Sequence, residues 1–170
     1  MAKARPGMQP TQQDVQPVLN QLEQGQLEAA CEGARGLTKR FPKHFFGFNL
    51  LGTALSGLGR NAEAIEAYQR AFRMAPGRPV LANNLASLIS TYRDDDASLD
   101  RAYTIARRLR GTDVPPFQDT YGWIQFRLGD YEEALEYLRD AARGLPNDPL
   151  VQHHLGMTYD ALERYDEARE

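Results

Sequence analysis

The sequence has a single cysteine, Cys31, so it cannot form an internal disulfide framework and its fold must be held by packing. It also has no surplus of basic residues, and a formal net charge of -3 argues against nucleic-acid binding. No apolar run approaches the length of a membrane span, and the N-terminal MAKARPGMQPTQQ has two positive charges without the apolar stretch of a signal peptide. We therefore expect a cytoplasmic protein that inserts into no membrane; a periplasmic or envelope-associated parent stays open.

The sequence is also poor in residues that do chemistry. His153 and His154 are neighbours, so on a helix their side chains diverge by about 100 degrees and cannot converge on one ion as an i, i+4 pair would. We expect both to be exposed or half-buried imidazoles. Cys31 has no histidine placed to activate it and is expected to be a small buried residue. No metal site, cofactor or catalytic residue is predicted, and the protein is not expected to be an enzyme.

What the sequence does contain is an internal repeat with a period of about 34 residues. Small residues recur at this spacing in the pairs Ala30 and Ala64, Gly52 and Ala86, Gly122 and Gly156, and Ala134 and Ala168. Residues 51–79 show the unit best: an apolar helix, a turn around Gly59, and a second helix with Ala64 and Tyr68 on one face, ended by Pro76. Each unit is therefore predicted to be two helices joined by a short turn.

This unit resembles the tetratricopeptide repeat (TPR), of bacterial type. The residues that carry the resemblance are Leu51, Gly52, Gly59, Ala64, Tyr68, Ala71 and Pro76, then Tyr121, Gly122, Gly129, Tyr131, Ala134, Leu138, Ala141 and Pro146, then Leu155, Gly156, Tyr159, Tyr165 and Ala168. The resemblance implies an all-α fold, a right-handed superhelical solenoid of antiparallel helix pairs with about four and a half repeats. Small residues such as Gly52, Gly122, Ala134 and Gly156 are expected where helices approach closely.

On this pattern the chain divides into a disordered leader and five repeats, all in one solenoid domain. The leader is 1–10, and the repeats are 11–44 (divergent, with Pro17 in its first helix), 45–78, 79–114 (with an insertion between its helices), 115–148 and 149–170 (truncated). The insertion carries Asp94, Asp95 and Asp96, which are expected to start a helix rather than bind calcium. Because the last repeat lacks a polar cap, we expect a fragment of a longer protein or an end covered by a partner.

The resemblance also implies where a partner would bind, since the first helices of stacked repeats line a concave groove. Residues three and four apart on these helices share that face. The candidate binding residues are Asn49, Thr53, Asn83, Asn84, Ser87, Asp119, Trp123, Phe126, Arg127 and His153. No lysine lies on this stripe, so recognition of an acidic C-terminal tail is not predicted.

For two residues of this stripe, Trp123 and Asn84, the sequence allows both a binding role and a purely structural one. Trp123, followed by Arg127, has the composition of a binding hot spot, but a tryptophan here could equally be core packing against the next helix. The Asn84 amide could bond a ligand backbone, since it both donates and accepts, or simply face water. Asp130, Glu132 and Glu133 are expected at turn or outer-surface positions.

These features predict a non-catalytic scaffold that binds a protein or peptide partner in its groove. A second interpretation is a repeat appendage of a larger bacterial enzyme, because the first half resembles repeat modules fused to transferases and the second half resembles envelope proteins of exopolysaccharide assembly. The two resemblances could also mean a chimera. A third interpretation is a self-assembling structural solenoid, with a homo-oligomer formed through the uncapped C-terminal end.

Overall fold

The structure, a computed structural model, describes residues 9–164 of the chain. Within that range it contains nine α-helices, one short 3-10 helix and no strand, so the all-α prediction is confirmed. Contacts between residues divide the chain into two compact units, Met1–Leu81 and Ala82–Glu170, with the boundary inside the fifth helix.

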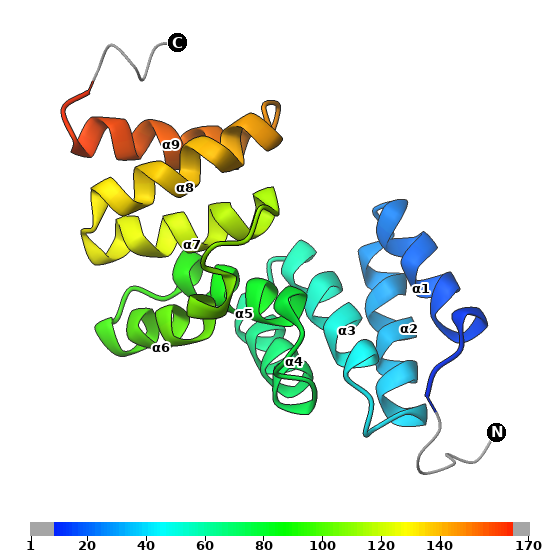
Figure 1. The fold of residues 1–170 in the computed structure, drawn as a ribbon. Helices are drawn as coiled ribbons and strands as arrows, with labels where there is room; N and C mark the ends of the chain where they lie inside the picture. Colours follow the sequence, from blue (N-terminus) through cyan, green and yellow to red (C-terminus); the bar gives the residue numbers. More distant parts are fainter. Residues whose placement is uncertain (1–8, 165–170) are drawn as a thin grey trace. The chain divides into compact units, whose positions relative to one another are not determined.

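The first unit consists of consecutive helices, each packed on its neighbours. Its elements are α1 (Gln12–Glu23), α2 (Leu27–Arg40), α3 (Phe45–Gly57), α4 (Asn61–Met74) and the first residues of α5 (Pro79–Tyr92). α1 contacts α2, α2 contacts α3, and α3 contacts α4 (Figure 1). The turns after α1 and α3 contain Gly25 and Gly59, whose φ angles are 69° and 71°, a conformation that costs glycine little. This is why such short turns can reverse the chain between antiparallel helices.

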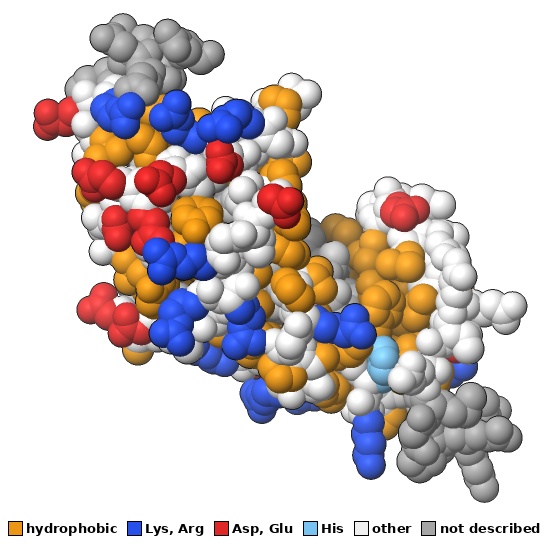
Figure 2. Space-filling view, in the orientation of Figure 1, with side chains coloured by type: hydrophobic (Ala, Val, Ile, Leu, Met, Phe, Trp, Pro, Cys, Tyr) orange, Lys and Arg blue, Asp and Glu red, His pale blue; other side chains and the backbone are white. Residues whose placement is uncertain are grey.

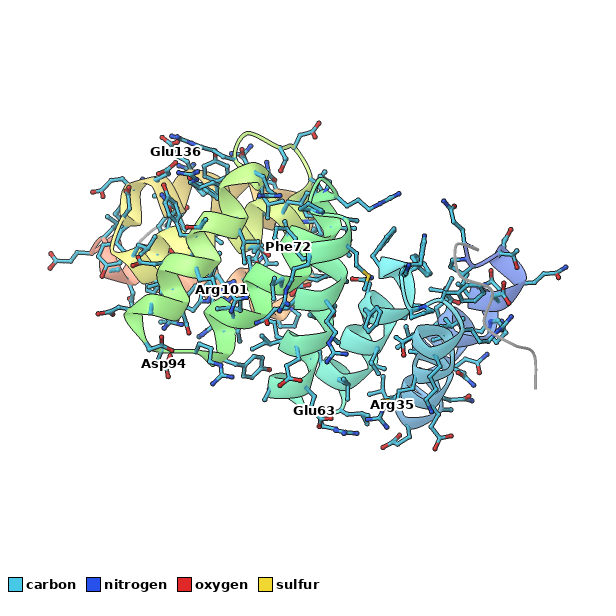
Figure 3. All side chains as sticks on the ribbon, turned by 90° about the horizontal axis from the view of Figure 1, so that it is seen from below. Arg35, Glu63, Phe72, Asp94, Arg101 and Glu136 are labelled. Atoms are coloured by element: carbon cyan, nitrogen blue, oxygen red, sulfur yellow. The ribbon has the colours of Figure 1, made fainter. Side chains whose placement is uncertain are left out.

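Burial in this unit follows the apolar period of each helix. Ala64, Tyr68 and Ala71 of α4 are all buried, as their spacing predicts. Phe48 of α3 and Leu81 pack with Ala71 in one core cluster. At the surface of the same unit, Arg35 of α2 and Glu63 of α4 lie side by side, with 3.9 Å between nitrogen and oxygen (Figure 3); both side chains are half exposed, so the pair adds little stability.

The second unit continues the same arrangement. It contains the remainder of α5, then α6 (Asp96–Ala106), the 3-10 helix η1 (Arg107–Leu109), α7 (Pro115–Leu128), α8 (Tyr131–Gly144) and α9 (Pro149–Ala161). α6 packs on α7, α7 on α8, and α8 on α9 (Figure 1). Its core includes a cluster of Ala141, Ala142 and Val151 between α8 and α9.

The expected repeats each enclose the helices observed in their range, from α1 and α2 in 11–44 to α9 in 149–170, and the division itself stays a prediction. Of the expected leader, residues 1–8 lie outside the described residues, as do residues 165–170 of the fifth repeat. Gly122 approaches α8 closely, with a Cβ there falling 2.8 Å from Leu138 Cγ, whereas one at Gly156 would meet no described atom within 4 Å. Among residues 9–164, no helix combines the length and apolarity needed to span a bilayer.

Candidate functional site

The candidate residues of the second unit lie mainly on α7 and α9, two first helices that contact each other. α7 begins with two prolines, whose missing N–H groups and preset φ suit a helix start, and ends at Gly129 in the left-handed conformation with φ of 87°. α9 begins after Asp148, whose side chain accepts hydrogen bonds from the N–H groups of Leu150 and Val151. These ends set the register in which the side chains of α7 and α9 meet.

Asp119 of α7 and His154 of α9 form a buried pair at the centre of this contact. Their side chains approach to 2.8 Å between Asp119 Oδ1 and His154 Nδ1, and the two residues are 9% and 4% exposed. The expectation that His154 is exposed or half-buried is therefore wrong. A helix position that looks polar in sequence is buried here because the neighbouring helix supplies a carboxylate to satisfy the imidazole.

Trp123 lies directly over this pair. Its ring stacks on the His154 ring, with centroids 4.1 Å apart and planes 12° apart, and on its other neighbour Phe126 at 4.9 Å and 8°. Phe126 in turn contacts the ring of Tyr131 at 5.3 Å. Trp123 and Phe126 are both half-buried. Trp123 therefore packs against the next helix, as one interpretation held, and still presents part of its ring at the surface, as the other required.

The indole nitrogen is the one polar atom of the Trp123 side chain. Nε1 is inaccessible to solvent and has no hydrogen-bond partner among the described residues. An unpaired buried N–H group costs free energy. The stacking of the Trp123 ring on its aromatic neighbours contributes free energy that offsets this cost. The ring is thus positioned by flat contacts on both sides rather than by a directed hydrogen bond.

Arg127, one turn further along α7, is engaged within the unit. Its guanidinium donates to the carbonyl oxygens of Ser90 and Arg93 and forms an ion pair of 3.0 Å with Asp94. The Asp94 carboxylate lies beside the end of α5 (Figure 3). A cation at the C-terminal end of a helix satisfies carbonyls that lack helical partners and complements the helix dipole. Arg127 therefore connects α7 to the end of α5 through hydrogen bonds and an ion pair.

His153 is exposed, unlike its neighbour, and its ring lies 6.3 Å from that of His154. Met157 follows one turn later on the same face and is 38% exposed. We call the surface formed by Trp123, Phe126, His153 and Met157 the α7–α9 surface. It combines two aromatic rings, an imidazole and a flexible thioether around a buried polar pair.

The three candidates on α5 lie in the same unit and are half-buried. The Asn83 amide nitrogen is 3.5 Å from Asn84 Oδ1, at the limit of a hydrogen bond, and Asn83 Oδ1 is buried without a partner among the described residues. The Ser87 carbonyl accepts from the Ser90 and Thr91 hydroxyls.

The two candidates of the first unit belong to α3. The Thr53 hydroxyl contacts the Asn49 carbonyl and the Tyr68 hydroxyl, each at 3.1 Å. Thr53 is exposed and Asn49 is half-buried. Thr53 therefore helps to orient the buried Tyr68 ring. Burial raises the pKa of Tyr68, and the hydrogen bond between Thr53 and Tyr68 partly offsets this rise.

A polar network between α7 and α8 was not anticipated. Glu133 accepts hydrogen bonds from the Tyr121 hydroxyl and the Gln125 amide, and pairs with Arg110 at 3.2 Å. Its side chain is 22% exposed, so Glu133 lies partly inside the contact between α7 and α8 rather than fully on the outer surface. Burial first, and then the Glu133 charge, raise the pKa of Tyr121. The network is structural: it holds the α7–α8 pair that carries Trp123.

The arrangement contains polar pairs but no catalytic constellation. Asp119 and His154 are both buried, and the Thr158 hydroxyl near them donates to the His154 carbonyl oxygen at 2.8 Å rather than to the imidazole or the carboxylate. Within the described ranges, no cluster of three or more His, Cys, Asp or Glu side chains could hold a metal ion. Cys31, as expected, is buried. What the α7–α9 surface can do chemically is bind by stacking and apolar contact.

Comparison with known proteins gives one family and many similar folds. A family model described as the tetratricopeptide repeat matches residues 14–170. The small glutamine-rich tetratricopeptide repeat-containing protein 2 of Mycosarcoma maydis is 38% identical over 63 residues, which are 37% of this chain. The match spans only 18% of that relative's length.

Several solved structures share the fold. A thermophilic TPR protein of Thermus thermophilus has a TM-score of 0.72 at 20% identity, covering 92% of this chain and 85% of its own. MamA of Desulfovibrio magneticus RS-1 has a TM-score of 0.71 at 13% identity, covering 93% and 88%. YrrB, described as a TPR protein with an unusual peptide-binding site, has a TM-score of 0.66 at 16% identity, covering 92% and 78%. The predicted fold class is confirmed by these likenesses.

Proposed function

The chain belongs to the tetratricopeptide repeat family, and from that premise we propose that it is a non-catalytic interaction module that binds an extended segment of a partner protein on the α7–α9 surface. The fold is typical of protein–protein interaction scaffolds. Binding of a peptide at this surface, the lack of catalysis, self-association and the cellular compartment are predictions.

The observation that carries the proposal is the stacked arrangement of Trp123. Its ring is held between Phe126 and His154, and His154 is itself held by the buried Asp119. Aromatic side chains that are already ordered lose little conformational freedom on binding, so they make effective anchors. A half-exposed tryptophan fixed in this way supports binding more strongly than a flexible one would.

The surroundings of the anchor favour an uncharged, partly apolar ligand. Arg127 is occupied by Ser90, Arg93 and Asp94, and so supplies no free charge for recognition. Met157 offers adaptable apolar contact beside the rings. YrrB, which shares the fold, is described as having a peptide-binding site, and this supports the class of ligand.

A random peptide library displayed on phage provides a test that needs no knowledge of the natural partner. Because Trp123 is the only tryptophan, its fluorescence reports on the site directly. We expect selected peptides to shift Trp123 emission in a saturable way. Replacing the exposed residues His153 and Met157 together by serine should weaken binding at least about fivefold, the effect of losing interface contacts worth about 1 kcal/mol. The helical signal in circular dichroism should not change, since both side chains are exposed.

Tyr92→Ser is the matched control, because Tyr92 is an exposed aromatic residue of α5 outside the α7–α9 surface, with 53% of its area accessible. Its removal should leave the affinity unchanged. Peptides that bind the double variant as tightly as the original chain, without any change in Trp123 emission, would place the binding elsewhere and contradict the proposal.

A further inference from the structure

A separate pocket of about 320 Å³ opens between the segment that precedes α7, the first turns of α7 and the middle of α8. It lies wholly within the second unit. Its lining residues are Gly111, Thr112, Asp113, Gln118, Glu136, Tyr137 and Asp140. None of them belongs to the α7–α9 surface, so we call it the Gln118 pocket and consider it on its own.

The charge of the Gln118 pocket is negative. Three carboxylates line it, from Asp113, Glu136 and Asp140. Asp140 is paired with Arg143 at 3.0 Å, whereas Asp113 and Glu136 have no ion-pair partner in the part of the chain that the structure describes. Figure 2 shows acidic side chains gathered over α8, and Figure 3 shows Glu136 projecting from that helix. Several carboxylates lining one pocket favour a cation over an anion or a neutral ligand.

Two buried polar groups in the same pocket lack partners. Gln118 is 9% exposed, and within residues 9–164 its side-chain amide has no hydrogen-bond partner. The Thr112 hydroxyl oxygen is inaccessible to bulk solvent and likewise has no partner among the described residues. The Gln118 side chain lines the pocket, so its amide oxygen can accept from a bound ligand with donors, whereas the Thr112 hydroxyl is enclosed by protein. The acceptors offered to a ligand are therefore a side-chain amide as well as the carboxylates.

This distribution suits a planar cation better than a metal ion. No three of the described carboxylates, histidines or cysteines come close enough together to hold a metal, so the acids of the pocket do not converge on one point. A guanidinium carries five N–H donors in a fixed plane, which can reach several separated acceptors at once. Tyr137, whose hydroxyl accepts from the Gly111 N–H at 3.2 Å, adds a ring surface of the kind on which guanidinium groups stack.

The size of the pocket points to one side chain rather than a whole cofactor, because it is at the lower end of the roughly 300 to 1,000 Å³ seen for small-molecule sites. We propose that the Gln118 pocket receives an arginine side chain of a partner protein. Asp113 and Glu136 pair with the guanidinium, and the Gln118 amide oxygen accepts from one of its remaining N–H groups. Arg110 does not line the pocket and pairs with Glu133 at 3.2 Å.

The test uses acetyl-Gly-Arg-Gly-amide as the probe, titrated into the isotope-labelled full chain and followed by NMR. We expect saturable shifts of the Gln118 side-chain amide and of the backbone amides of Gly111 and Tyr137. The same peptide with citrulline in place of arginine keeps the shape without the charge and should bind about tenfold more weakly or not at all. A lysine peptide should bind more weakly than the arginine peptide, since an ammonium reaches fewer acceptors.

Two variants separate binding from folding. Gln118→Met replaces the unpaired amide by an apolar group of similar length, so the free energy of unfolding should hold or rise while affinity for the arginine peptide falls. Glu136→Gln should weaken binding about tenfold, by the loss of a charge-assisted contact. Glu132→Gln removes an exposed acid of α8 that does not line the pocket and should have no effect.

Equal binding of the arginine and citrulline peptides would overturn the proposal, as would shifts scattered over every acidic surface, which would indicate nonspecific attraction. The His153 and Met157 double variant should bind the arginine probe normally. The experiments therefore distinguish a lack of peptide binding at the α7–α9 surface from a lack of arginine binding in the Gln118 pocket.

Discussion

Gly52 lies at a close approach of α3 and α4. A Cβ placed there would fall 2.5 and 2.6 Å from two carbon atoms of the Tyr68 ring, which is 6% exposed and bonded to Thr53. The ring cannot move aside without losing that contact. We expect Gly52→Ala to lower the free energy of unfolding by about 1–3 kcal/mol, the usual cost of overpacking a filled core. Urea unfolding followed by circular dichroism measures this.

Gly36→Ala is the matched control at another helical glycine of the first unit. A Cβ at Gly36 would meet no described atom within 4 Å. Because alanine is favoured over glycine in a helix interior, this variant should gain roughly 0.5–1 kcal/mol. Two alanine substitutions with the same sign would show that helix propensity, not the approach to Tyr68, decides the outcome.

His44 makes the stability of the first unit depend on pH. Its Nδ1 accepts from the N–H of Phe46 at 3.3 Å and so caps α3. Burial, and then the Arg78 charge, lower the pKa of His44 below its usual 6.5. The unfolded chain therefore takes up the proton at higher pH than the folded chain does. This contribution is fully present above the unfolded pKa and is lost as the pH falls through the lower folded pKa.

The comparison that isolates His44 is His44→Asn, because asparagine can cap a helix without titrating near neutral pH. Between about pH 7.5 and pH 5 the urea midpoint of the original chain should fall further than that of the variant, with His44 as the titrating group. Parallel midpoints over this range would show that protonation of His44 has no effect on folding.

At the residue scale, the sequence predicted which residues share a helix face better than it predicted which side chains they contact on neighbouring helices. The period of about 34 residues located Gly52 and Gly122, and both are close approaches. The same period placed Asp119 and Arg127 on a binding stripe, yet Asp119 pairs with His154 and Arg127 with the end of α5. Helical spacing defines which residues share a face, but the partner across a helix contact depends on register between helices, which no single unit encodes.

At the element scale, the irregular third repeat shows how an insertion is accommodated. The sequence placed extra residues between its helices. The structure gives most of them to α6, which begins six positions before the buried Ala102, whereas α4 begins three positions before the equivalent Ala64. Asp95 caps this added turn by accepting from the Ser98 N–H at 2.8 Å, so the prediction that the acids start a helix is confirmed.

The contact of Arg127 with α5 yields a prediction at the same scale. Arg127→Ala would leave the Ser90 carbonyl, in a residue that is 0% exposed, without this donor. We expect a loss of about 1.5–3 kcal/mol, the range for hydrogen bonds to charged groups. Arg127→Lys should retain part of it, since a single ammonium cannot reach all three acceptors that the guanidinium reaches.

Hydrogen exchange shows where in the structure the substitution acts. Amides near the end of α5, including that of Arg93, should exchange faster in the alanine variant. An Arg127→Ala chain with unchanged stability and unchanged exchange in α5 would mean that the contact is incidental, and Arg127 would return to the list of free binding residues.

At the scale of the whole molecule, each unit has a core of its own: Phe48, Ala71 and Leu81 in the first, and Ala141, Ala142 and Val151 in the second. In repeat proteins, stability is approximately a sum over units and nearest neighbours, so a local defect should have a local effect. The repeat signal made this architecture predictable from sequence. The division at α5 was not, because the spacing is continuous across it.

Gly52→Ala and Gly122→Ala place equivalent defects in the two units. At Gly122 the added Cβ would fall 2.8 Å from Leu138 Cγ and 3.2 Å from the Ala134 carbonyl oxygen, and backbone cannot yield cheaply. We expect Gly52→Ala to speed hydrogen exchange mainly in α3 and α4, and Gly122→Ala mainly in α7 and α8. If either variant sped exchange equally in all four helices, the chain would unfold as one cooperative body, and the approximation of additive repeats would fail for this protein.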